Sequence, residues 1–403
     1  MLMAMNQTPA ANRIHIGFFG KRNAGKSSLV NAVTGQSLAI VSDVKGTTTD
    51  PVYKTMELLP MGPVMIIDTP GIDDEGELGE LRVKKTRQVL NKTDVAILVV
   101  DGNEGMTAVD EEMERLIQEK NIPYIIAVNK TDLISDKKLT NNSDKTDEKK
   151  LWVSAANGTG IHELKERISH LSIREENQRK IVGDLLEPGD FVVLVMPIDG
   201  SAPKGRLILP QQQTIRDILD AGAVSIAVKD TELKMTLQKL GTKPKLVITD
   251  SQVFRQVSQD VPKDIPLTSF SILFARYKGE LTGMIEGVRA LEDLEDGDRV
   301  LISEGCTHHR QCDDIGICKI PKWIYEYTGK KLEFEWSSGT EFPEELSNYK
   351  LIVHCGGCML NEREMKYRQK CAKDQRVPMV NYGILIAQTQ GILKRSIEMF
   401  EFG

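Results

Sequence analysis

Short apolar runs alternate with amphipathic segments over the first 172 residues of the chain. The runs are rich in β-branched residues, and a loop and a helical pattern follow each of them. Strands that are apolar along their whole length are typical of a parallel sheet covered by helices on both faces. The sequence therefore predicts an α/β domain over residues 1–172, with strands at Ile14–Phe19, Val64–Ile67, Val95–Val100 and Tyr124–Val128.

The same alternation continues from about residue 180 to residue 270. Strand patterns at Phe191–Met196, Ala223–Val228 and Lys245–Thr249 enclose helical patterns at Gln211–Leu219 and Thr231–Leu240. This block contains neither cysteine nor histidine, and its acidic residues fall at predicted helix surfaces and turns. We expect a second α/β domain over residues 173–270, with a structural or subunit-contact role.

A third α/β domain is predicted over residues 271–403. Helical patterns at Ser271–Glu292 and Ile384–Phe400 enclose two strand patterns, Arg299–Ser303 and Lys350–Val353. Each of these strands runs directly into a fragment that contains cysteine and histidine. Ligands of open α/β sheets bind at the carboxyl ends of the strands, so the two fragments are expected to meet at one edge.

Composition and charge limit the classes of function. Hydrophobic residues make up 40% of the 403 residues and charged residues 27%, as in ordinary soluble globular proteins. The formal net charge of −6 speaks against a dominant nucleic-acid surface, which needs a basic stripe. The N-terminus lacks the regions of a secretory signal, and no apolar run reaches the ~18 residues of a membrane span. We expect a cytoplasmic protein that binds neither nucleic acid nor membrane.

All six cysteines lie after residue 300. Three of them form the fragments Cys306-Thr307-His308 and His354-Cys355-Gly356-Gly357-Cys358. Thiols in a protein that is not secreted are more often metal-binding or redox-active than disulfide-bonded, and thiolates hold zinc or an iron–sulfur cluster. Three cysteines without a defined fourth ligand suit a 4Fe-4S cluster with one exchangeable iron. The remaining cysteines, at positions 312, 318 and 371, are expected to be small buried hydrophobic residues.

A phosphate-binding loop is predicted near the N-terminus. The pattern Gly20-x4-Gly25-Lys26-Ser27 follows an apolar strand and opens a helix. Glycines let backbone N–H groups wrap a β-phosphate, and the helix N-terminus adds favourable partial charge. In such a loop Lys26 reaches the β- and γ-phosphates, and the Ser27 hydroxyl ligates magnesium.

Further motifs follow in the order that a GTPase requires. In Asp68-Thr69-Pro70-Gly71, Asp68 is expected to hold magnesium through water, and the Gly71 amide to sense the γ-phosphate. The carboxylate of Asp132, in Asn129-Lys130-Thr131-Asp132, can accept two hydrogen bonds that guanine supplies and adenine does not. Ser154-Ala155 fits the guanine oxygen, and Gly46–Thr49 a switch segment. The predicted GTP-binding residues are Asn23, Ala24, Gly25, Lys26, Ser27, Ser28, Thr47, Thr48, Asp68, Gly71, Asn129, Lys130, Asp132, Ser154 and Ala155.

Residues 12–172 resemble the GTPases of the Era and tRNA-modification type. The resemblance implies that Thr48 coordinates magnesium together with Ser27 and Asp68. Ile72 stands where many GTPases carry a water-orienting glutamine. Relatives with an asparagine in the phosphate loop use a potassium ion instead, which points to Asn23 and to potassium-stimulated hydrolysis. Ala156 departs from the lysine that often follows the Ser-Ala pair.

The chain as a whole resembles the (FeFe)-hydrogenase maturation GTPases of the HydF family. The resemblance rests on the GTPase motifs followed by Cys306-x-His308 and His354-Cys355-x-x-Cys358. It implies a GTPase domain, a middle dimerisation domain that forms a homodimer, and a domain that binds a 4Fe-4S cluster on Cys306, Cys355 and Cys358. The fourth ligand varies in such proteins, and His308, Asp313 and His354 are the candidates here.

The same resemblance implies a scaffold or carrier for the di-iron subcluster precursor. Such a protein receives the precursor from radical-SAM maturases and delivers it to apo-(FeFe)-hydrogenase. Two other functions remain open. One is a GTPase of ribosome or tRNA maturation whose cysteines hold structural zinc, against which the acidic balance counts. The other is a redox sensor that gates the GTPase.

Overall fold

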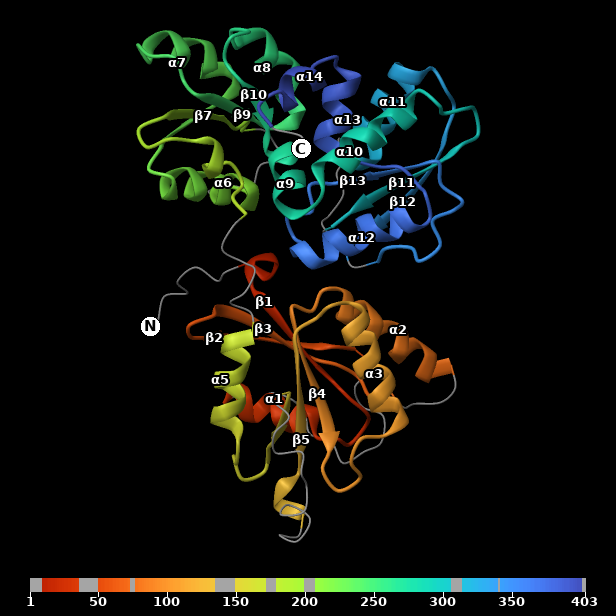
Figure 1. Ribbon diagram of the computed structural model, residues 1–403. Coiled ribbons are helices and arrows are strands. Elements are labelled where there is room, and N and C mark those ends of the chain that lie inside the picture. Colours follow the sequence, from red (N-terminus) through yellow and green to blue (C-terminus); the bar gives the residue numbers. More distant parts are fainter. Residues whose placement is uncertain are drawn as a thin grey trace. The chain divides into compact units, whose positions relative to one another are not determined.

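The computed structural model describes residues 9–35, 50–72, 77–134, 149–171, 179–198, 207–305, 314–339 and 341–400. The chain divides into two compact units, Met1–Gln178 (unit 1) and Arg179–Gly403 (unit 2), and each is described by itself (Figure 1). The predicted α/β class with mostly parallel sheets is confirmed. The boundary predicted near residue 270, inside unit 2, stays a prediction.

Unit 1 is built on a six-stranded sheet in the order β2-β3-β1-β4-β5-β6. Its strand pairs are parallel except for the pair of β2 with β3. Its elements are β1 (Ile14–Phe19), α1 (Lys26–Thr34), β2 (Val52–Leu58), β3 (Gly62–Asp68), α2 (Glu77–Asn91), β4 (Val95–Asp101), α3 (Ala108–Glu119), β5 (Tyr124–Asn129), β6 (Lys150–Trp152) and α5 (Ile161–Leu171).

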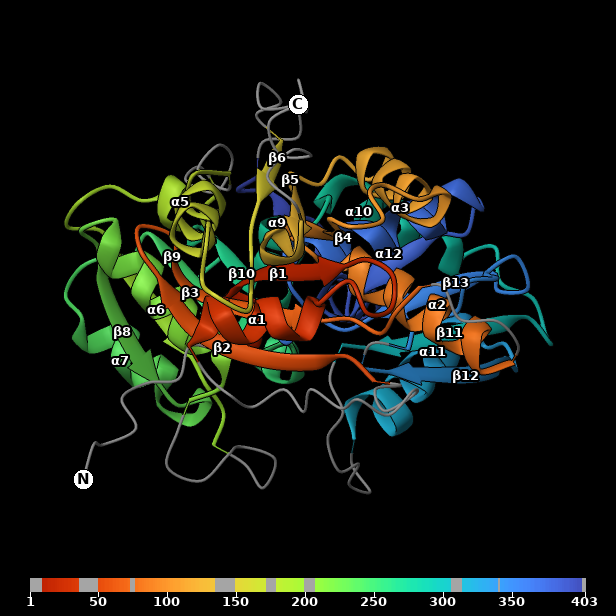
Figure 2. The same ribbon diagram turned by 90° about the horizontal axis from the view of Figure 1, so that it is seen from below.

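Two apolar cores cover the two faces of this sheet. Helices α1 and α5 bury Leu29 and Leu164 on one face, and α2 and α3 bury Leu90 and Ile117 on the other (Figures 1 and 2). The four predicted strands lie in the middle of the sheet. Strands β2 and β6 at its edges were not predicted, because β2 alternates exposed and buried residues and β6 is three residues long.

Unit 2 contains two four-stranded sheets, in the orders β10-β9-β7-β8 and β12-β11-β13-β14, and all their pairs are parallel. The two sheets lie side by side in both ribbon views (Figures 1 and 2). The elements are β7 (Phe191–Val195), α6 (Leu209–Asp220), β8 (Val224–Val228), α7 (Leu233–Lys239), β9 (Leu246–Thr249), α8 (Phe254–Asp260), β10 (Leu267–Ser269), α9 (Phe270–Lys278), α10 (Leu281–Gly287), β11 (Arg299–Glu304), α11 (Ile320–Thr328), β12 (Glu333–Ser338), β13 (Leu351–His354), α12 (Glu362–Asp374), β14 (Met379–Asn381), α13 (Tyr382–Thr389) and α14 (Leu393–Ile397).

The two sheets of unit 2 are repeats of one strand order. Taken in chain order, each sheet places its second strand at one edge, then its first, third and fourth. The first repeat, residues 186–281, and the second, residues 294–393, both open on a Leu-Glu-x-Gly-Asp turn. In each turn the aspartate accepts a hydrogen bond of 2.8 Å from the glutamate N–H, at Asp190 and at Asp298. In both turns the glycine has a left-handed backbone, with φ of 90° at Gly189 and 87° at Gly297.

Each repeat also ends on the same strand-to-helix unit. Pro266, Ile272, Leu273, Ala275, Gly279 and Leu281 recur in that spacing as Pro378, Ile384, Leu385, Ala387, Gly391 and Leu393. Ser269 and Asn381 cap the helices that follow, each accepting a hydrogen bond from the backbone N–H three residues on. Our expectation of continuous helices over Ser271–Glu292 and Ile384–Phe400 is wrong. Both segments break at these glycines, at Gly279 with an extended backbone and at Gly391 with φ of 72°.

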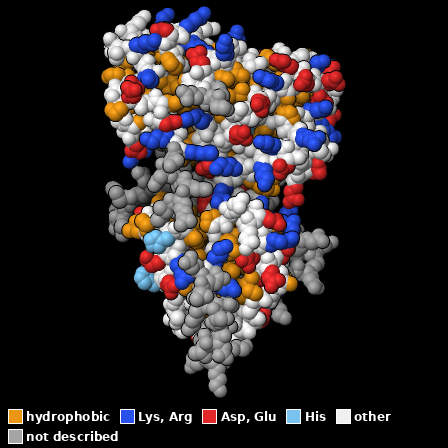
Figure 3. Space-filling view, viewed as in Figure 1, with side chains coloured by type: hydrophobic (Ala, Val, Ile, Leu, Met, Phe, Trp, Pro, Cys, Tyr) orange, Lys and Arg blue, Asp and Glu red, His pale blue; other side chains and the backbone are white. Residues whose placement is uncertain are grey.

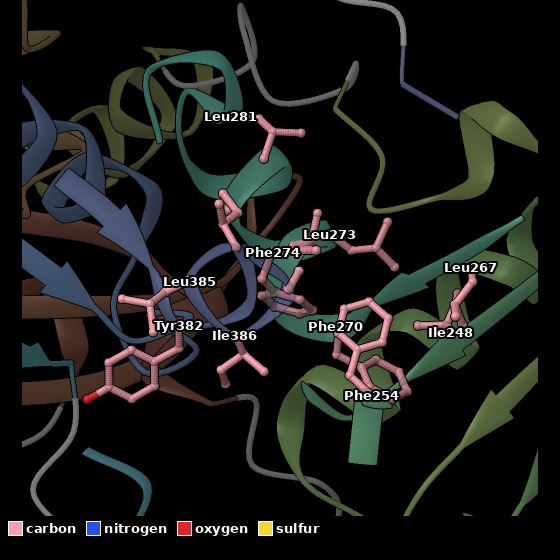
Figure 4. Close-up of a cluster of buried hydrophobic side chains, with 14 of the residues drawn as sticks. Ile248, Phe254, Leu267, Phe270, Leu273, Phe274, Leu281, Tyr382, Leu385 and Ile386 are labelled. Carbon is pink, nitrogen blue, oxygen red and sulfur yellow. The ribbon is translucent and has the colours of Figure 1, made fainter. Parts of the chain in front are cut away.

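The short helix that follows each break packs on the other repeat. Helix α10 packs on β14, and the backbones approach so closely that a Cβ at Gly287 would lie 2.2 Å from the Met379 carbonyl oxygen. Helix α14 packs on β10, and its Arg395 donates to backbone carbonyls of the first repeat, including 2.6 Å to Pro262. A single apolar core runs through both repeats, and Figure 4 shows Ile248 and Leu267 joined to Leu385 through Phe270.

The surface carries both signs of charge. On the face in Figure 3, Lys and Arg side chains alternate with Asp and Glu over both units. Within the described ranges, no helix combines the length and apolar character that crossing a membrane requires.

Candidate functional site

The predicted phosphate loop lies between β1 and α1. Gly20 and Gly25 have φ of 138° and 89°, and Asn23 has φ of 59°, so three positions of the loop lie outside the usual range for L residues. Gly25 precedes the first residue of α1, as a glycine that exposes helix N-terminal N–H groups must. The loop therefore has the backbone of an anion-binding turn.

Lys26 bridges this loop from inside. Its side chain is buried, and its Nζ donates hydrogen bonds of 2.8 Å to the Gly20 carbonyl and 2.7 Å to the Lys21 carbonyl. The ammonium group is therefore held over the centre of the loop, where phosphate oxygens would be its natural partners.

Ser27 and Asp68 meet at the predicted magnesium position. The Ser27 hydroxyl donates to Asp68 Oδ2 over 2.5 Å, and burial raises the pKa of the Asp68 carboxyl, against its bond to Ser27. Within the described ranges, the buried oxygen Asp68 Oδ1 has no hydrogen-bond partner. A hydroxyl beside a buried carboxylate with an oxygen to spare is a donor set of the kind that magnesium prefers, so these residues fit the ion.

The Asp68-Thr69-Pro70-Gly71 turn is fixed against the phosphate loop. The Thr69 hydroxyl donates to the Phe18 carbonyl over 2.6 Å. A Cβ at Gly71 would lie 3.0 Å from the backbone nitrogen of Arg22, so the Gly71 backbone lies directly beside the loop. This brings the predicted γ-phosphate sensor to the predicted phosphate site.

Asn129 ties the phosphate loop to the predicted base site. Its side-chain nitrogen donates to the Ala24 carbonyl over 3.0 Å, and its side-chain oxygen accepts from the Ala155 N–H over 3.0 Å. Lys130 forms a 2.6 Å ion pair with Asp101. Asp132 is exposed, and its Oδ1 accepts a hydrogen bond of 2.5 Å from the buried Ser154 hydroxyl.

The structure brings together most of the predicted GTP-binding residues. Ser28 lies in the first turn of α1, beside Ser27. Thr47 and Thr48, with the rest of the predicted switch segment Gly46–Thr49, lie outside the described residues. The same holds for Cys306, His308 and Asp313 of the predicted cluster site.

The end of β11 and the second cysteine fragment meet at the carboxyl ends of neighbouring strands. Strands β11 and β13 pair in parallel, with Ser303 opposite His354. The Gly305 N–H, one residue before the first fragment's cysteine, donates to Cys355 Sγ over 3.0 Å, and the Gly357 N–H donates to the same sulfur over 3.4 Å. Where side chains are described, no three metal-ligating residues gather at one point.

Burial opposes negative charge on these two sulfurs, and nearby donors offset part of that effect. Burial raises the pKa of the Cys355 thiol to about 11, while N–H bonds from Gly305 and Gly357 lower it. Burial also raises the pKa of Cys358, and the nearby ammonium of Lys278 lowers it. Backbone N–H groups aimed at a sulfur, with a cation beside it, are features that favour a metal-bound thiolate, so the described part of the site fits a cluster.

His354 is buried, and both of its ring nitrogens are engaged. Nδ1 lies 2.7 Å from the Cys355 carbonyl oxygen and Nε2 lies 3.1 Å from the Arg368 guanidinium. Burial and the Arg368 charge lower the pKa of His354 to about 3, so the ring is neutral and donates through Nδ1 while Nε2 accepts. These contacts tie His354 to the cysteine loop, and its assignment as a fourth ligand or as a supporting residue stays a prediction.

Arg368 organises a polar cluster that the sequence did not reveal. Its fully buried guanidinium pairs with Glu364 over 3.0 Å and donates to the Ser303 hydroxyl and to the Gly339 carbonyl. In sequence, Glu364 and Arg368 have the spacing of an exposed helical ion pair, so their burial required the structure.

Two further polar residues near the cysteines were also missed. Glu304, the last residue of β11, is buried and accepts 3.2 Å from the Tyr382 hydroxyl. Lys278, at the end of α9, is buried beneath the cysteine loop. Among the other cysteines, Cys318 lies on a short π-helix, Ile315–Lys319, and is exposed. Our prediction that Cys318 is buried is therefore wrong. Cys371 on α12 is half-buried.

Known proteins with a similar sequence include GTPases. GTPase Der of Wolinella succinogenes is 35% identical over 187 residues, which are 44% of this chain and 39% of that protein. tRNA modification GTPase MnmE of Acetivibrio thermocellus is 35% identical over 159 residues, 39% of this chain and 34% of that protein. The chain thus spans well under half the length of these relatives.

Among solved structures, Era of Aquifex aeolicus bound to GDP and aluminium fluoride is 21% identical. The match covers 53% of this chain and 92% of that chain, with a TM-score of 0.36.

Three protein-family models match consecutive segments. The 50S ribosome-binding GTPase model matches residues 15–130. The hydrogen maturase F dimerization domain matches residues 181–279, and the hydrogen maturase F tetramerization domain matches residues 282–399. The two hydrogen maturase F matches together span more than half of the 403 residues and come after the GTPase segment in the chain. The chain therefore belongs to the hydrogen maturase F (HydF) family of hydrogenase maturation GTPases.

Proposed function

We propose that this protein binds and hydrolyses GTP and holds a 4Fe-4S cluster on Cys306, Cys355 and Cys358. With that cluster it serves as scaffold or carrier of the di-iron precursor for apo-(FeFe)-hydrogenase. The observation that carries the proposal is the convergence of Gly305 and the Cys355–Cys358 loop at one sheet edge, in a chain whose other unit carries a complete phosphate loop.

Nucleotide binding would use the loop residues already placed. N–H groups from the loop to Ser28 would surround the phosphates, and the Lys26 ammonium would exchange its two carbonyl partners for phosphate oxygens. Ser27 and Asp68, with Thr48 from the switch segment, would hold magnesium. The exposed carboxylate of Asp132 would accept from the guanine N1–H and amine.

Hydrolysis would depend on a potassium ion. Ile72 offers no group that could orient the attacking water. Asn23 is exposed on the phosphate loop and has a left-handed backbone conformation. Its amide oxygen is a ligand that a monovalent cation accepts, and such a cation would neutralise charge that develops between the β- and γ-phosphates.

The cluster site would act through an open coordination position. A 4Fe-4S cluster held by three cysteines supplies one iron to which a second metal fragment can attach and from which it can leave. The residues of the chain would orient the sulfur: Gly305 and Gly357 donate to Cys355 Sγ, and His354 donates to the Cys355 carbonyl.

Nucleotide state would control partners through ordering of the segments around Thr48 and Gly71. We further propose that radical-SAM maturases and apo-hydrogenase bind this chain in different nucleotide states. We also propose that the chain forms a homodimer through unit 2, and its matches to dimerization and tetramerization domains support self-association.

Guanine selectivity is testable at Asp132. The change Asp132→Asn replaces an acceptor by a donor and loses two charge-assisted hydrogen bonds, so GTP affinity is expected to fall at least ~100-fold. Affinity for xanthosine triphosphate should rise, because xanthine has a carbonyl where guanine has an amine. Calorimetry measures both. The matched control Glu112→Gln on α3 makes the same chemical change outside the site, and equal losses in both variants would refute the assignment.

Potassium dependence is testable by GTP turnover in chloride buffers of equal ionic strength. We expect turnover in potassium to exceed that in sodium by about tenfold, which corresponds to ~1.4 kcal/mol of transition-state stabilisation. Asn23→Ala should lower the rate in potassium toward the rate in sodium. Equal rates of the unaltered protein in the two buffers would remove the proposal.

The cluster is testable by anaerobic reconstitution and EPR of the dithionite-reduced protein. The signal of a 4Fe-4S cluster is expected in the unaltered protein and in Cys371→Ser, and it should be lost in the double variant Cys355→Ser, Cys358→Ser. Stoichiometric zinc without sulfide would instead support a zinc-structured GTPase of ribosome or tRNA maturation.

Self-association is testable by sedimentation. Sedimentation velocity should give a dimer or larger species, and a monomer at all concentrations would contradict self-association.

Nucleotide control of partner binding is testable with immobilised apo-hydrogenase. The affinity of this chain for it should differ by at least about tenfold between GTP, GDP and no nucleotide, a coupling of ~1.4 kcal/mol. Identical affinities in the three states would exclude nucleotide control of this partner.

A further inference from the structure

Lys278 lies beneath the loop that carries two of the cysteines. It is the last residue of α9 and is 3% exposed. Its Nζ donates three hydrogen bonds, of 3.0 Å to the Gly357 carbonyl, 3.1 Å to the Cys358 carbonyl and 2.6 Å to the Leu360 carbonyl. An ammonium has three protons, so one side chain satisfies all its donors on this one turn of backbone.

The burial of this charge has no counter-ion to explain it. A buried lysine normally pairs with a carboxylate, because desolvation of the ammonium is costly. Among the described residues, Lys278 forms no ion pair within 4.0 Å, and its hydrogen-bond acceptors are neutral carbonyls. Burial lowers the pKa of Lys278 to about 8, and the charges of Cys358 and Cys355 in their thiolate form and of the Glu362 carboxylate act against this effect.

The second repeat shows that the fold does not need a lysine at this place. Gln390 occupies the position in the second repeat that Lys278 occupies in the first, one residue before the glycine that breaks each helix. Helix α10, which follows Lys278, packs on the second repeat. Lys278 of the first repeat therefore lies beside the second repeat and donates to the loop after β13. At the corresponding point after β9 the chain has Asp250 and no cysteine. Lysine and cysteines therefore occur at the same edge.

We propose that Lys278 is the positioning residue of the cluster loop. It holds the turn from Cys355 to Leu360 in the conformation that presents both sulfurs, and its positive charge stabilises the reduced, more negative state of the cluster. The proposal rests on the proposed cluster function. Since Lys278 lies in the segment matched by the dimerization domain and the loop in the segment matched by the tetramerization domain, it also joins the two matched segments.

The positioning role is testable without metal, by hydrogen–deuterium exchange of the apo-protein. In Lys278→Met, the amides of residues 356–361 should exchange at least about tenfold faster, because the Leu360 N–H bond to the Gly357 carbonyl loses its support. The amides after β9 in the first repeat serve as the internal reference and should not change. Unaltered exchange of residues 356–361 would overturn the positioning role.

The charge role is testable by redox titration of the reconstituted cluster, followed by EPR. In Lys278→Met the reduction equilibrium constant should fall about tenfold, a shift of about 59 mV for one electron. Lys278→Arg, which keeps the charge, should retain most of the potential of the unaltered protein. Lys350→Met removes the same charge from the amino end of β13, where the side chain is exposed, and should leave the potential unchanged.

The outcomes separate this inference from the proposed function. An unaltered potential in Lys278→Met, or an equal shift in Lys350→Met, would overturn the charge role. Failure of the unaltered protein to bind a cluster would refute the proposed function, while the exchange experiment would still decide whether Lys278 holds the loop. If Lys278→Met does not fold, as judged by circular dichroism, Lys278→Gln, which introduces the residue found at position 390, replaces it in both experiments and carries the same expected results.

Discussion

Burial of parallel sheets on both faces is the constraint from which the rest of this protein follows. Strands β1 and β13 are buried along their whole length, and most of their residues are apolar. The polar groups of both candidate sites lie at or just after the carboxyl ends of strands, where the chain leaves the sheet. In unit 1, Lys26 lies in the segment after β1, and Asp68 is the last residue of β3. In unit 2, Cys355 follows β13. Both candidate sites are therefore solutions to the same problem, which is to place polar groups at an edge without disturbing a covered sheet.

This constraint decides how much the sequence could predict. A motif such as Asp68-Thr69-Pro70-Gly71 is contiguous and follows a recognisable strand, so its place was predictable from the sequence. The contacts of Asn129 with Ala24 and Ala155 were not, because they join segments that only the folded sheet brings together. Arg368 and Lys278 escaped for another reason. Each is a charged residue in a helical pattern, which sequence alone assigns to the solvent side, and burial followed only from packing against the second sheet of unit 2.

The repeat in unit 2 was also not predicted from the sequence. Its two copies agree at positions that the fold requires, such as the turns at Gly189 and Gly297 and the breaks at Gly279 and Gly391. Between these positions the copies differ in the length of their connections, and β12 reaches β13 without the helix that joins β8 to β9. The agreement is therefore spread over short pieces at unequal spacings, and only the common strand order makes it evident.

Where the two copies differ in chemistry, the difference falls at the cysteine edge. The buried residues of α8 are Phe254 and Val257, and Met365 and Arg368 have the same spacing on α12. Val257 and Arg368 are both fully buried. Replacing valine by arginine in a core is costly unless each donor is satisfied, and Glu364, His354, Ser303 and Gly339 supply the partners. Because the first copy forms the same fold with an apolar residue, folding does not demand this arginine. The network that it builds fixes the ring of His354 and, through it, the carbonyl of Cys355, so the desolvation cost in the second copy is accepted for the geometry of the cysteine edge.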